Sequence, residues 1–171
     1  IGSTATKGDG AGEMEALQKI DIGGFATQIT AGRYFTCALT VKDEVKCWGY
    51  GAKGQLGNGL TTNIADAVNE MGENLAVTLT GVHKVAAATD STCAVMKDFS
   101  VRCWGGNTYG TLGYDDTTQR NTPGPRLKMG GKVVDINGGT DTFCAVFDDG
   151  QAKCWGNGDH GKLGITGHQG D

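Results

Sequence analysis

The stretch FTCALTVKDEVKCWGYGAKGQLG, residues 35–57, decides the fold, because two close copies of it follow along the chain. The copies are STCAVMKDFSVRCWGGNTYGTLG from residue 91 and TFCAVFDDGQAKCWGNGDHGKLG from residue 142, which gives a period of roughly 54 residues. In each copy two cysteines are ten positions apart, Trp-Gly follows the second cysteine, and a leucine comes eight positions after the tryptophan. The chain is therefore expected to consist of three similar structural units.

Short β segments, separated by glycines or charged turns, are predicted in every unit. Apolar and polar residues alternate over five or six positions, which is typical of antiparallel strands rather than helices. In the first unit the expected strands cover residues 17–22, 26–31, 35–40 and 44–48. A helix is expected only at residues 12–20, with one or two turns at most. The sequence thus predicts an all-β fold.

The six cysteines are expected to form one disulfide within each unit. The turn Asp148-Asp149-Gly150 has a glycine for the left-handed position of a three-residue loop, which puts Cys144 directly opposite Cys154. Facing residues at a non-hydrogen-bonded site lie within disulfide reach. The predicted disulfides are Cys37–Cys47, Cys93–Cys103 and Cys144–Cys154. Free thiols and structural zinc are the alternatives, but buried thiols need not recur in facing pairs, and zinc ligands usually lie two to four residues apart.

The repeat resembles a known family. The pattern I-x-A-G-x-x-x-T-C-A-L, followed by V-K-C-W-G-x-x-x-x-G-Q-L-G-x-G, covers residues 29–59 and is similar to the repeat of the regulator of chromosome condensation superfamily. Looser copies cover residues 85–113 and 136–164. The resemblance implies β-propeller blades of four antiparallel strands, seven of which close a ring. It implies little about function, since one fold hosts many functions. The paired cysteines and the acidic balance differ from the nuclear founder of the superfamily and argue against its exchange-factor role.

Three blades are too few to close a propeller, which needs about four to eight. The expected blades cover residues 3–57, 58–113 and 114–164, and residues 165–171 begin a following blade. The residues expected to pack the blades together are Trp48, Trp104, Trp155, Leu56, Leu112 and Leu163. Sugar stacking is the alternative for the tryptophans. Two apolar blade faces are expected to stay uncovered, so the chain is predicted to be incomplete as a ring.

The two ends of the chain fall at the same phase of the repeat. A shift of three periods places Ile1-Gly2 on Leu163-Gly164. The chain is therefore expected to be a cut from a longer tandem array, or one subunit of a head-to-tail filament whose contacts do not close.

Composition excludes several classes of protein. The chain has 30 glycines in 171 residues but no Gly-X-Y period, which excludes collagen. No apolar run approaches the ~18 residues of a membrane-spanning helix, so no membrane span is predicted. The balance of 15 Lys+Arg against 19 Asp+Glu is unfavourable for phosphate binding, and nucleic acid is not an expected partner. Disulfides persist in oxidising compartments, which places the protein outside the cell or on its surface.

No catalytic, cofactor or metal site is predicted. Gly49-x-Gly51-x-x-Gly54 matches a dinucleotide-binding motif, but a Leu-Gly turn follows it instead of the required helix. The acidic pairs at residues 115–116 and 148–149 are expected to form turns, and calcium binding is the alternative. The three histidines share no spacing with a nucleophile and are expected to be solvated; they are His83, His160 and His168.

The preferred functional prediction is a non-catalytic structural repeat module of an extracellular or cell-surface protein or fibre. Its partners are expected to be neighbouring blades or copies of the same protein. The alternative is a secreted propeller that binds a protein or glycan ligand through loops such as YDDTTQR, residues 114–120. An enzyme or exchange factor is the least favoured class, because the chain lacks a recognisable site.

Overall fold

The computed structural model describes residues 6–164, so Ile1, Gly2 and the predicted start of a fourth blade lie outside the described residues. The strands are β1 (Ala26–Ala31), β2 (Phe35–Thr40), β3 (Glu44–Gly49), β4 (Val77–Thr80), β5 (Val82–Ala87), β6 (Ser91–Met96), β7 (Val101–Gly105), β8 (Val133–Gly139), β9 (Thr142–Phe147) and β10 (Ala152–Gly156). The helical turns are α1 (Glu13–Ala16), η1 (Gly72–Asn74) and η2 (Asp159–Gly161). In residues 6–164 no helix is long and apolar enough to cross a membrane.

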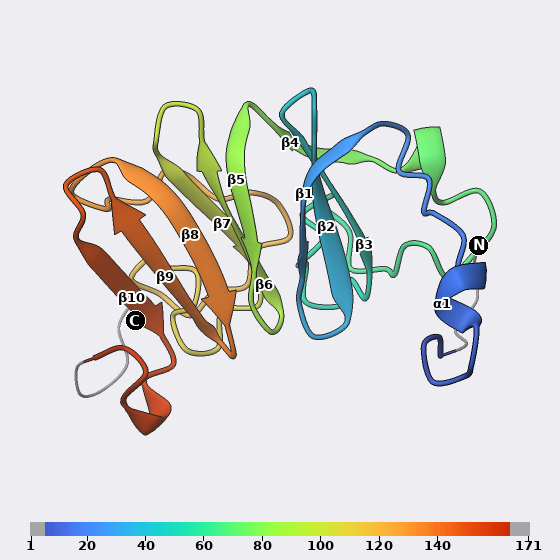
Figure 1. Cartoon of the computed structure of the whole chain (residues 1–171). Helices are drawn as coiled ribbons and strands as arrows, with labels where there is room; N and C mark the ends of the chain where they lie inside the picture. Colours follow the sequence, from blue (N-terminus) through green and yellow to red (C-terminus); the bar gives the residue numbers. More distant parts are fainter. Residues whose placement is uncertain (1–5, 165–171) are drawn as a thin grey trace.

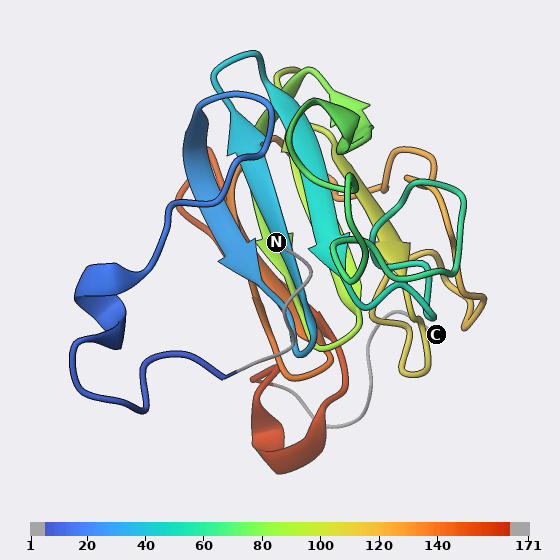
Figure 2. The same ribbon diagram turned by 90° about the vertical axis from the view of Figure 1, so that its right-hand side faces the viewer.

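Three antiparallel sheets stand side by side and pack face to face, as Figures 1 and 2 show from two directions. Their strand orders are β1-β2-β3-β4, β5-β6-β7 and β8-β9-β10, and neighbouring strands within each sheet are antiparallel. The first strands of the three sheets, β1, β5 and β8, lie next to one another. The predicted all-β fold of three blades that do not close a ring is confirmed.

One predicted strand is wrong. Residues 17–22 do not form a strand, although 26–31, 35–40 and 44–48 do. The fourth strand of the first sheet is instead β4, which pairs with β3 on the outer edge. The first sheet therefore extends past residue 57, where the sequence predicts the first blade to end. The helix expected within residues 12–20 is the single turn α1.

The second sheet has three strands rather than the predicted four. Residues 124–127 run beside β7, where the amides of Gly124 and Leu127 donate to the carbonyls of Cys103 and Val101 over 3.0 and 2.9 Å. A regular strand cannot form there, because Pro123 and Pro125 have no backbone N–H to donate. Proline thus reduces the outer strand of this blade to an irregular edge. The third sheet also has three strands within the described residues.

The two faces of each blade differ, and we call them the Cys face and the Trp face. The Cys face of the first blade carries Cys37, Leu39, Val45 and Cys47, as the alternation predicts. The Trp face consists of the residues between them, such as Ala38 and Trp48. In both described interfaces, the Cys face of one blade packs on the Trp face of the next.

The Trp face of the first blade is covered by the chain itself. We call the covering residues, 21–24 and 64–75, the cap (Figure 1, right). Ile22, Met71 and Leu75 are buried against Ala38 and Trp48. The expectation of two uncovered blade faces is therefore wrong for the first blade, because sequence periodicity carries no sign of the segment that folds over its end.

A buried ammonium group ties the cap to the sheet. The Nζ of Lys46, only 5% exposed, donates to the carbonyl of Ile22 over 2.9 Å. The cap closes on itself where the amide of Gly72 donates to the carbonyl of Asp21 over 3.1 Å. Gly23 lies at this contact with φ of 65°, and a Cβ there would come within 2.5 Å of the Gly72 oxygen. The cap thus needs glycine at position 23.

Candidate interaction surfaces

The three predicted disulfides are present. Each joins facing residues of a hairpin, with Cα atoms 4.1 Å apart. Gly150 takes the left-handed conformation that the hairpin requires, with φ of 83°. The first two disulfides are buried in the interfaces between blades, whereas Cys144 and Cys154 are partly exposed. The three bonds thus have the same connectivity but different surroundings.

Two tryptophans bridge consecutive blades. The Nε1 of Trp104 donates to the carbonyl of Gln55 in the first blade over 3.0 Å, and Trp155 makes the same bond to Thr111 in the second. Trp104 is fully buried and Trp155 nearly so. These rings are therefore inaccessible for stacking on a sugar. Trp48 is partly buried beside the cap.

The leucines that follow the tryptophans lie at the same joints. Leu56 is buried in the core between the first two blades and Leu112 in the core between the second and third. Leu163, at the end of the third blade, is 8% exposed. The repeat thus brings tryptophan and leucine together between blades, not within one blade.

The Cys face of the third blade is open. Val146 is 41% exposed, whereas its equivalents Leu39 and Val95 are 5% and 0% exposed. Ala152 is also exposed, although Val45 at the same position of the first blade is buried. The two cysteines between them are partly exposed. This face is the one on the left of Figure 1. The equivalent faces of the first and second blades are covered in the two internal interfaces.

The loop at residues 114–120 is held by its own contacts. The Tyr114 hydroxyl donates to the carbonyl of Pro125 over 2.8 Å and accepts from the amide of Cys103 over 3.0 Å. Arg120 forms an ion pair with Asp116, with the closest nitrogen and oxygen 2.8 Å apart, and its guanidinium lies 4.2 Å from the centre of the Tyr114 ring. In the loop that is predicted to bind a ligand, the side chains of Tyr114, Asp116 and Arg120 are therefore engaged in contacts within the chain.

These contacts shift two pKa values. The hydrogen bond from Arg120 is the main cause that lowers the pKa of Asp116 to about 2. Burial raises the pKa of the Tyr114 hydroxyl above its ordinary value, although the bond to Cys103 and nearby arginines oppose the rise. Because the Asp116 carboxylate already accepts from Arg120 and Asn107, it serves the loop rather than a calcium site.

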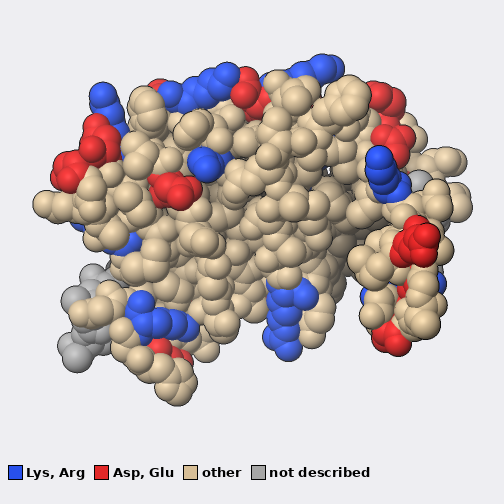
Figure 3. Space-filling view, viewed as in Figure 1, with Lys and Arg blue, Asp and Glu red and all other residues tan. Residues whose placement is uncertain are grey.

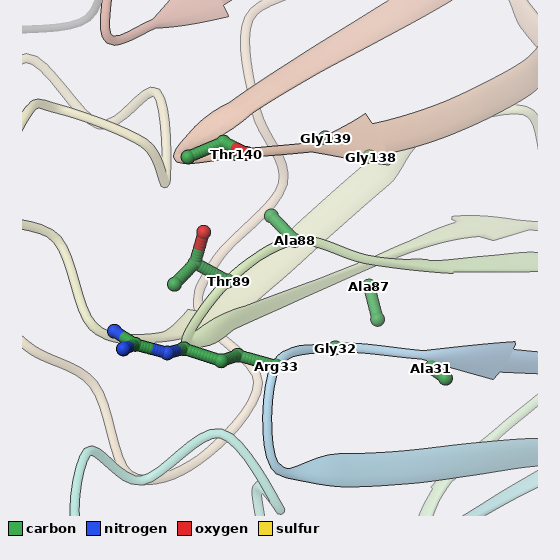
Figure 4. Close-up of a pocket in the computed structure, with 9 residues that line it drawn as sticks. All are labelled: Ala31, Gly32, Arg33, Ala87, Ala88, Thr89, Gly138, Gly139 and Thr140. Atoms are coloured by element: carbon green, nitrogen blue, oxygen red, sulfur yellow. The ribbon is translucent and has the colours of Figure 1, made fainter.

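A cleft of about 490 Å³ opens where the innermost strands end (Figure 4). Its lining repeats through the blades, with Gly32, Ala88 and Gly139 at one equivalent position of the three strands. Arg33 supplies its only charged side chain among the lining residues, and Thr89 and Thr140 supply hydroxyl groups. The cleft is polar at its rim, and no histidine or carboxylate lines it that could activate these hydroxyl groups as nucleophiles.

The other motifs of the sequence are structural. A Cβ on Gly51 would lie 2.0 Å from the carbonyl of Thr62, so the glycine motif at residues 49–54 serves close packing. In residues 6–164 no three His, Cys, Asp or Glu side chains gather as metal ligands would. The ring of His83 packs edge-on to Phe99, and His160 lies in η2. His168 lies outside the described residues.

Many charged side chains lie along the upper edge of the molecule in Figure 3, where hairpin turns are found. The centre of the face shown in Figure 3 has few charged side chains. Some of them pair between blades: Lys97 with Asp43, and Lys84 with Asp135 over 3.8 Å. Exposed pairs of this kind contribute little to stability, about 0–1 kcal/mol each. The apolar interfaces and the indole hydrogen bonds therefore hold the blades together.

Comparison with known proteins agrees with this architecture. The sequence profile of the regulator of chromosome condensation (RCC1) repeat matches residues 26–55 and 133–162. The mouse protein described as probable E3 ubiquitin-protein ligase HERC4 is 31% identical over 154 residues, which cover 88% of this chain and 14% of that protein. The crystal structure of human WBSCR16 has 33% identity and a TM-score of 0.63, over 80% of this chain and 34% of that one.

Yeast RCC1 (Prp20), crystallised bound to Kap60, has the same fold at 19% identity, with a TM-score of 0.65 over 85% of this chain and 35% of that one. The chain thus spans about a third or less of the length of these relatives. The three stacked sheets, joined by tryptophans that bond to the preceding sheet, therefore correspond to blades of this β-propeller fold. Residues 26–55 and 133–162 are RCC1 repeats, and the chain is an RCC1-like β-propeller repeat module.

Proposed function

We propose that this chain is a non-catalytic repeat module of an extracellular or cell-surface protein, and that it acts by packing against neighbouring blades and binding other proteins. The observation that carries the proposal is a disulfide at the same facing position of every blade. Such bonds persist in oxidising compartments and are rare in the cytosol. The described residues also offer no cluster of His, Cys, Asp or Glu for metal chemistry.

The thiol state of the protein in its own cells tests this placement. Cells that make the protein are quenched in acid, the chain is alkylated under denaturing, non-reducing conditions, and the cysteine peptides are analysed by mass spectrometry. The expected result is that all six cysteines escape alkylation until a reductant is added. A sample reduced before alkylation is the positive control. Six alkylated thiols in the quenched sample would overturn the extracellular placement.

Ligand binding is the second candidate function, and the cleft favours it. The rim presents one guanidinium, from Arg33, beside two threonine hydroxyl groups, which suits a carboxylate-bearing glycan or acidic peptide. A sialylated oligosaccharide and a poly-glutamate peptide are titrated against the chain by calorimetry, with Arg33→Ala as the matched variant. Saturable binding that Arg33→Ala weakens about tenfold or more would support the candidate. Equal heats from both proteins would refute it.

A further inference from the structure

A second pocket, of about 280 Å³, lies where the cap meets the outer edge of the first sheet. Ile64, Glu70 and Leu75 of the cap line it, together with Asn58 and residues at the start of β4. The other two blades pack on a neighbouring blade where the first blade carries the cap. The pocket, which we call the cap pocket, is therefore a feature of this chain and not of the repeat.

Part of the lining is apolar. Leu60 lines the cap pocket and is 54% exposed. Ile64 and Leu75 line it as well and belong to the hydrophobic cluster beneath the cap. Ligand pockets typically combine apolar walls of this kind with a few polar groups that orient the ligand. The cap pocket therefore offers a surface for a short carbon chain.

The polar part of the lining consists mainly of side-chain amides, those of Asn58, Asn69 and Asn74. The Nδ2 of Asn74 donates to the carbonyl of Asn69 over 2.9 Å, which leaves the Oδ1 of Asn74 as an acceptor. The Oδ1 of Asn58 accepts from the amide of Leu60 over 3.0 Å, which leaves the Nδ2 of Asn58 as a donor. The amides thus supply hydrogen-bonding groups of both kinds.

Glu70 is the only charged side chain among the described residues that line the cap pocket. Its Oε2 atom accepts from the amides of Ala65 and Ala67 over 2.8 and 2.9 Å. Because one oxygen makes both bonds, Oε1 keeps its own acceptor sites. Ala65 has φ of 78°, which is unfavourable for a residue with a side chain, so its bond to Glu70 helps to hold the loop in this shape. The pocket therefore presents one negative charge at a fixed place.

We propose that the cap pocket binds a small primary alkylammonium ion. An ammonium group has three N–H donors and no acceptor. The Oε1 of Glu70, the Oδ1 of Asn74 and the amide of Asn69 supply acceptors for these donors, and the carbon chain would lie on Leu60. A hydrogen bond between ionised partners is stronger than one between neutral groups. The inference goes beyond the proposed function and does not depend on the extracellular placement.

A titration with n-butylammonium chloride, at neutral pH and constant ionic strength, tests the proposal. NMR follows the side-chain amides of Asn58, Asn69 and Asn74 and the methyl groups of Leu60. Their shifts are expected to saturate together in the millimolar range, because so small a ligand makes few contacts. A titration in which these groups show no saturable shift would overturn the proposal.

Two compounds with the same carbon chain serve as controls for the charge. n-Butanol lacks the ammonium group, and butyrate carries the opposite charge to the one that Glu70 attracts. Both are expected to bind at least about tenfold more weakly than n-butylammonium. Equal binding of either compound would show that the carboxylate does not select the ligand, contrary to the proposal.

Glu70→Gln removes the charge but keeps an oxygen for the amides of Ala65 and Ala67. Binding of n-butylammonium is expected to weaken about tenfold or more. Glu73→Gln is the matched control, because Glu73 is exposed in η1 and does not line the pocket. Unchanged binding by Glu70→Gln, or equal weakening in the two variants, would contradict the assignment of Glu70.

Ala76→Phe tests the pocket without touching the carboxylate. Ala76 lines the cap pocket and is exposed, so a larger side chain there takes up space without entering the core. Saturable binding is expected to be lost, whereas hydrogen exchange at the amide of Gly72 is expected to stay slow if the cap is intact. This variant decides the question if Glu70→Gln disturbs the cap, and binding of natural strength to Ala76→Phe would refute the site.

Discussion

At the scale of residues, the indole hydrogen bond is the most specific link between blades. The Gln55 carbonyl accepts from Trp104 and also from the Thr92 hydroxyl, over 3.0 and 2.9 Å, deep in the interface. A buried carbonyl with two donors loses only part of its hydrogen bonding when one donor is removed. The ring itself supplies the larger contribution, through the area it buries.

Trp104→Phe is therefore expected to destabilise the chain by about 1–3 kcal/mol, from the lost N–H donor and a small cavity. Trp48→Phe is the matched control, because Trp48 is only partly buried and contacts the cap. Urea unfolding of both variants measures the difference. A Trp48→Phe cost equal to or above that of Trp104→Phe would contradict the assigned role of the indole in joining blades.

Asp116 makes the loop at residues 114–120 sensitive to acid. Its pKa is lowered from 3.8 to about 2, chiefly by the hydrogen bond from Arg120. A lowered pKa contributes stability that is present above the unfolded value and is lost as the pH falls through the folded value. Because the side chain is 36% exposed, solvent screening reduces the contribution to about 1 kcal/mol.

Asp116→Asn should therefore remove about 1 kcal/mol of stability at neutral pH and flatten the loss of stability between about pH 4 and pH 2. Urea unfolding at a series of pH values measures both effects. Asp115→Asn is the control, since Asp115 is exposed and asparagine tolerates its positive φ of 57°. Identical pH profiles for Asp116→Asn and the natural chain would show that the ion pair does not stabilise the loop.

At the scale of elements, the cap replaces the blade that would otherwise cover the first sheet. Repeat proteins need terminal units that shield their apolar end. Here the shield is made of irregular chain and η1, fastened by the bonds from Lys46 to Ile22 and from Gly72 to Asp21. The cap is thus a separate element, which is also joined to β3 by two backbone hydrogen bonds between Ile64 and Gly49.

Lys46→Met keeps an apolar stem but removes the ammonium donor. The amide of Gly72 is expected to exchange its hydrogen about tenfold faster, because the Ile22 carbonyl loses its partner and the cap opens more often. Lys42→Met, at an exposed turn position, serves as the control. Hydrogen exchange measured by NMR would disprove the role of Lys46 if both variants left Gly72 unchanged.

At the scale of the whole molecule, the three blades are unequally protected. The second blade is covered on both faces by its neighbours, and the first blade is covered by the cap on one face and by the second blade on the other. The third blade is covered only on its Trp face, within the described residues. In proteins built from stacked units, stability comes from each unit and its interfaces with its neighbours. Unfolding is therefore expected to begin at the third blade.

Native-state hydrogen exchange should show this gradient. Amides of β6, in the doubly covered blade, are expected to exchange more slowly than the hydrogen-bonded amides of β9, by about tenfold or more. Addition of denaturant should open β9 and β10 before β5 and β6. Exchange of β6 and β9 at one common rate would mean that the blades unfold as a single unit, contrary to this expectation.

The sequence by itself determined the repeat, the hairpins and the cysteine pairing. These depend on contacts within about ten residues, where strand alternation and turn chemistry leave one arrangement for Cys144 and Cys154.

The tertiary structure alone decided what lies over each face. Residues 17–22 form no strand, and β4 takes the fourth place in the first sheet. The sequence could not show this, because the pairing of β4 with β3 and the burial of Ile22 over Ala38 join segments that are far apart in the chain. Likewise, Tyr114 could be identified in the sequence as a loop residue, but only the fold brought its hydroxyl group to Cys103 and Pro125, each eleven residues away. The open face of the third blade follows from the same cause: a blade face is apolar by its pattern, and what covers it depends on its neighbour in space.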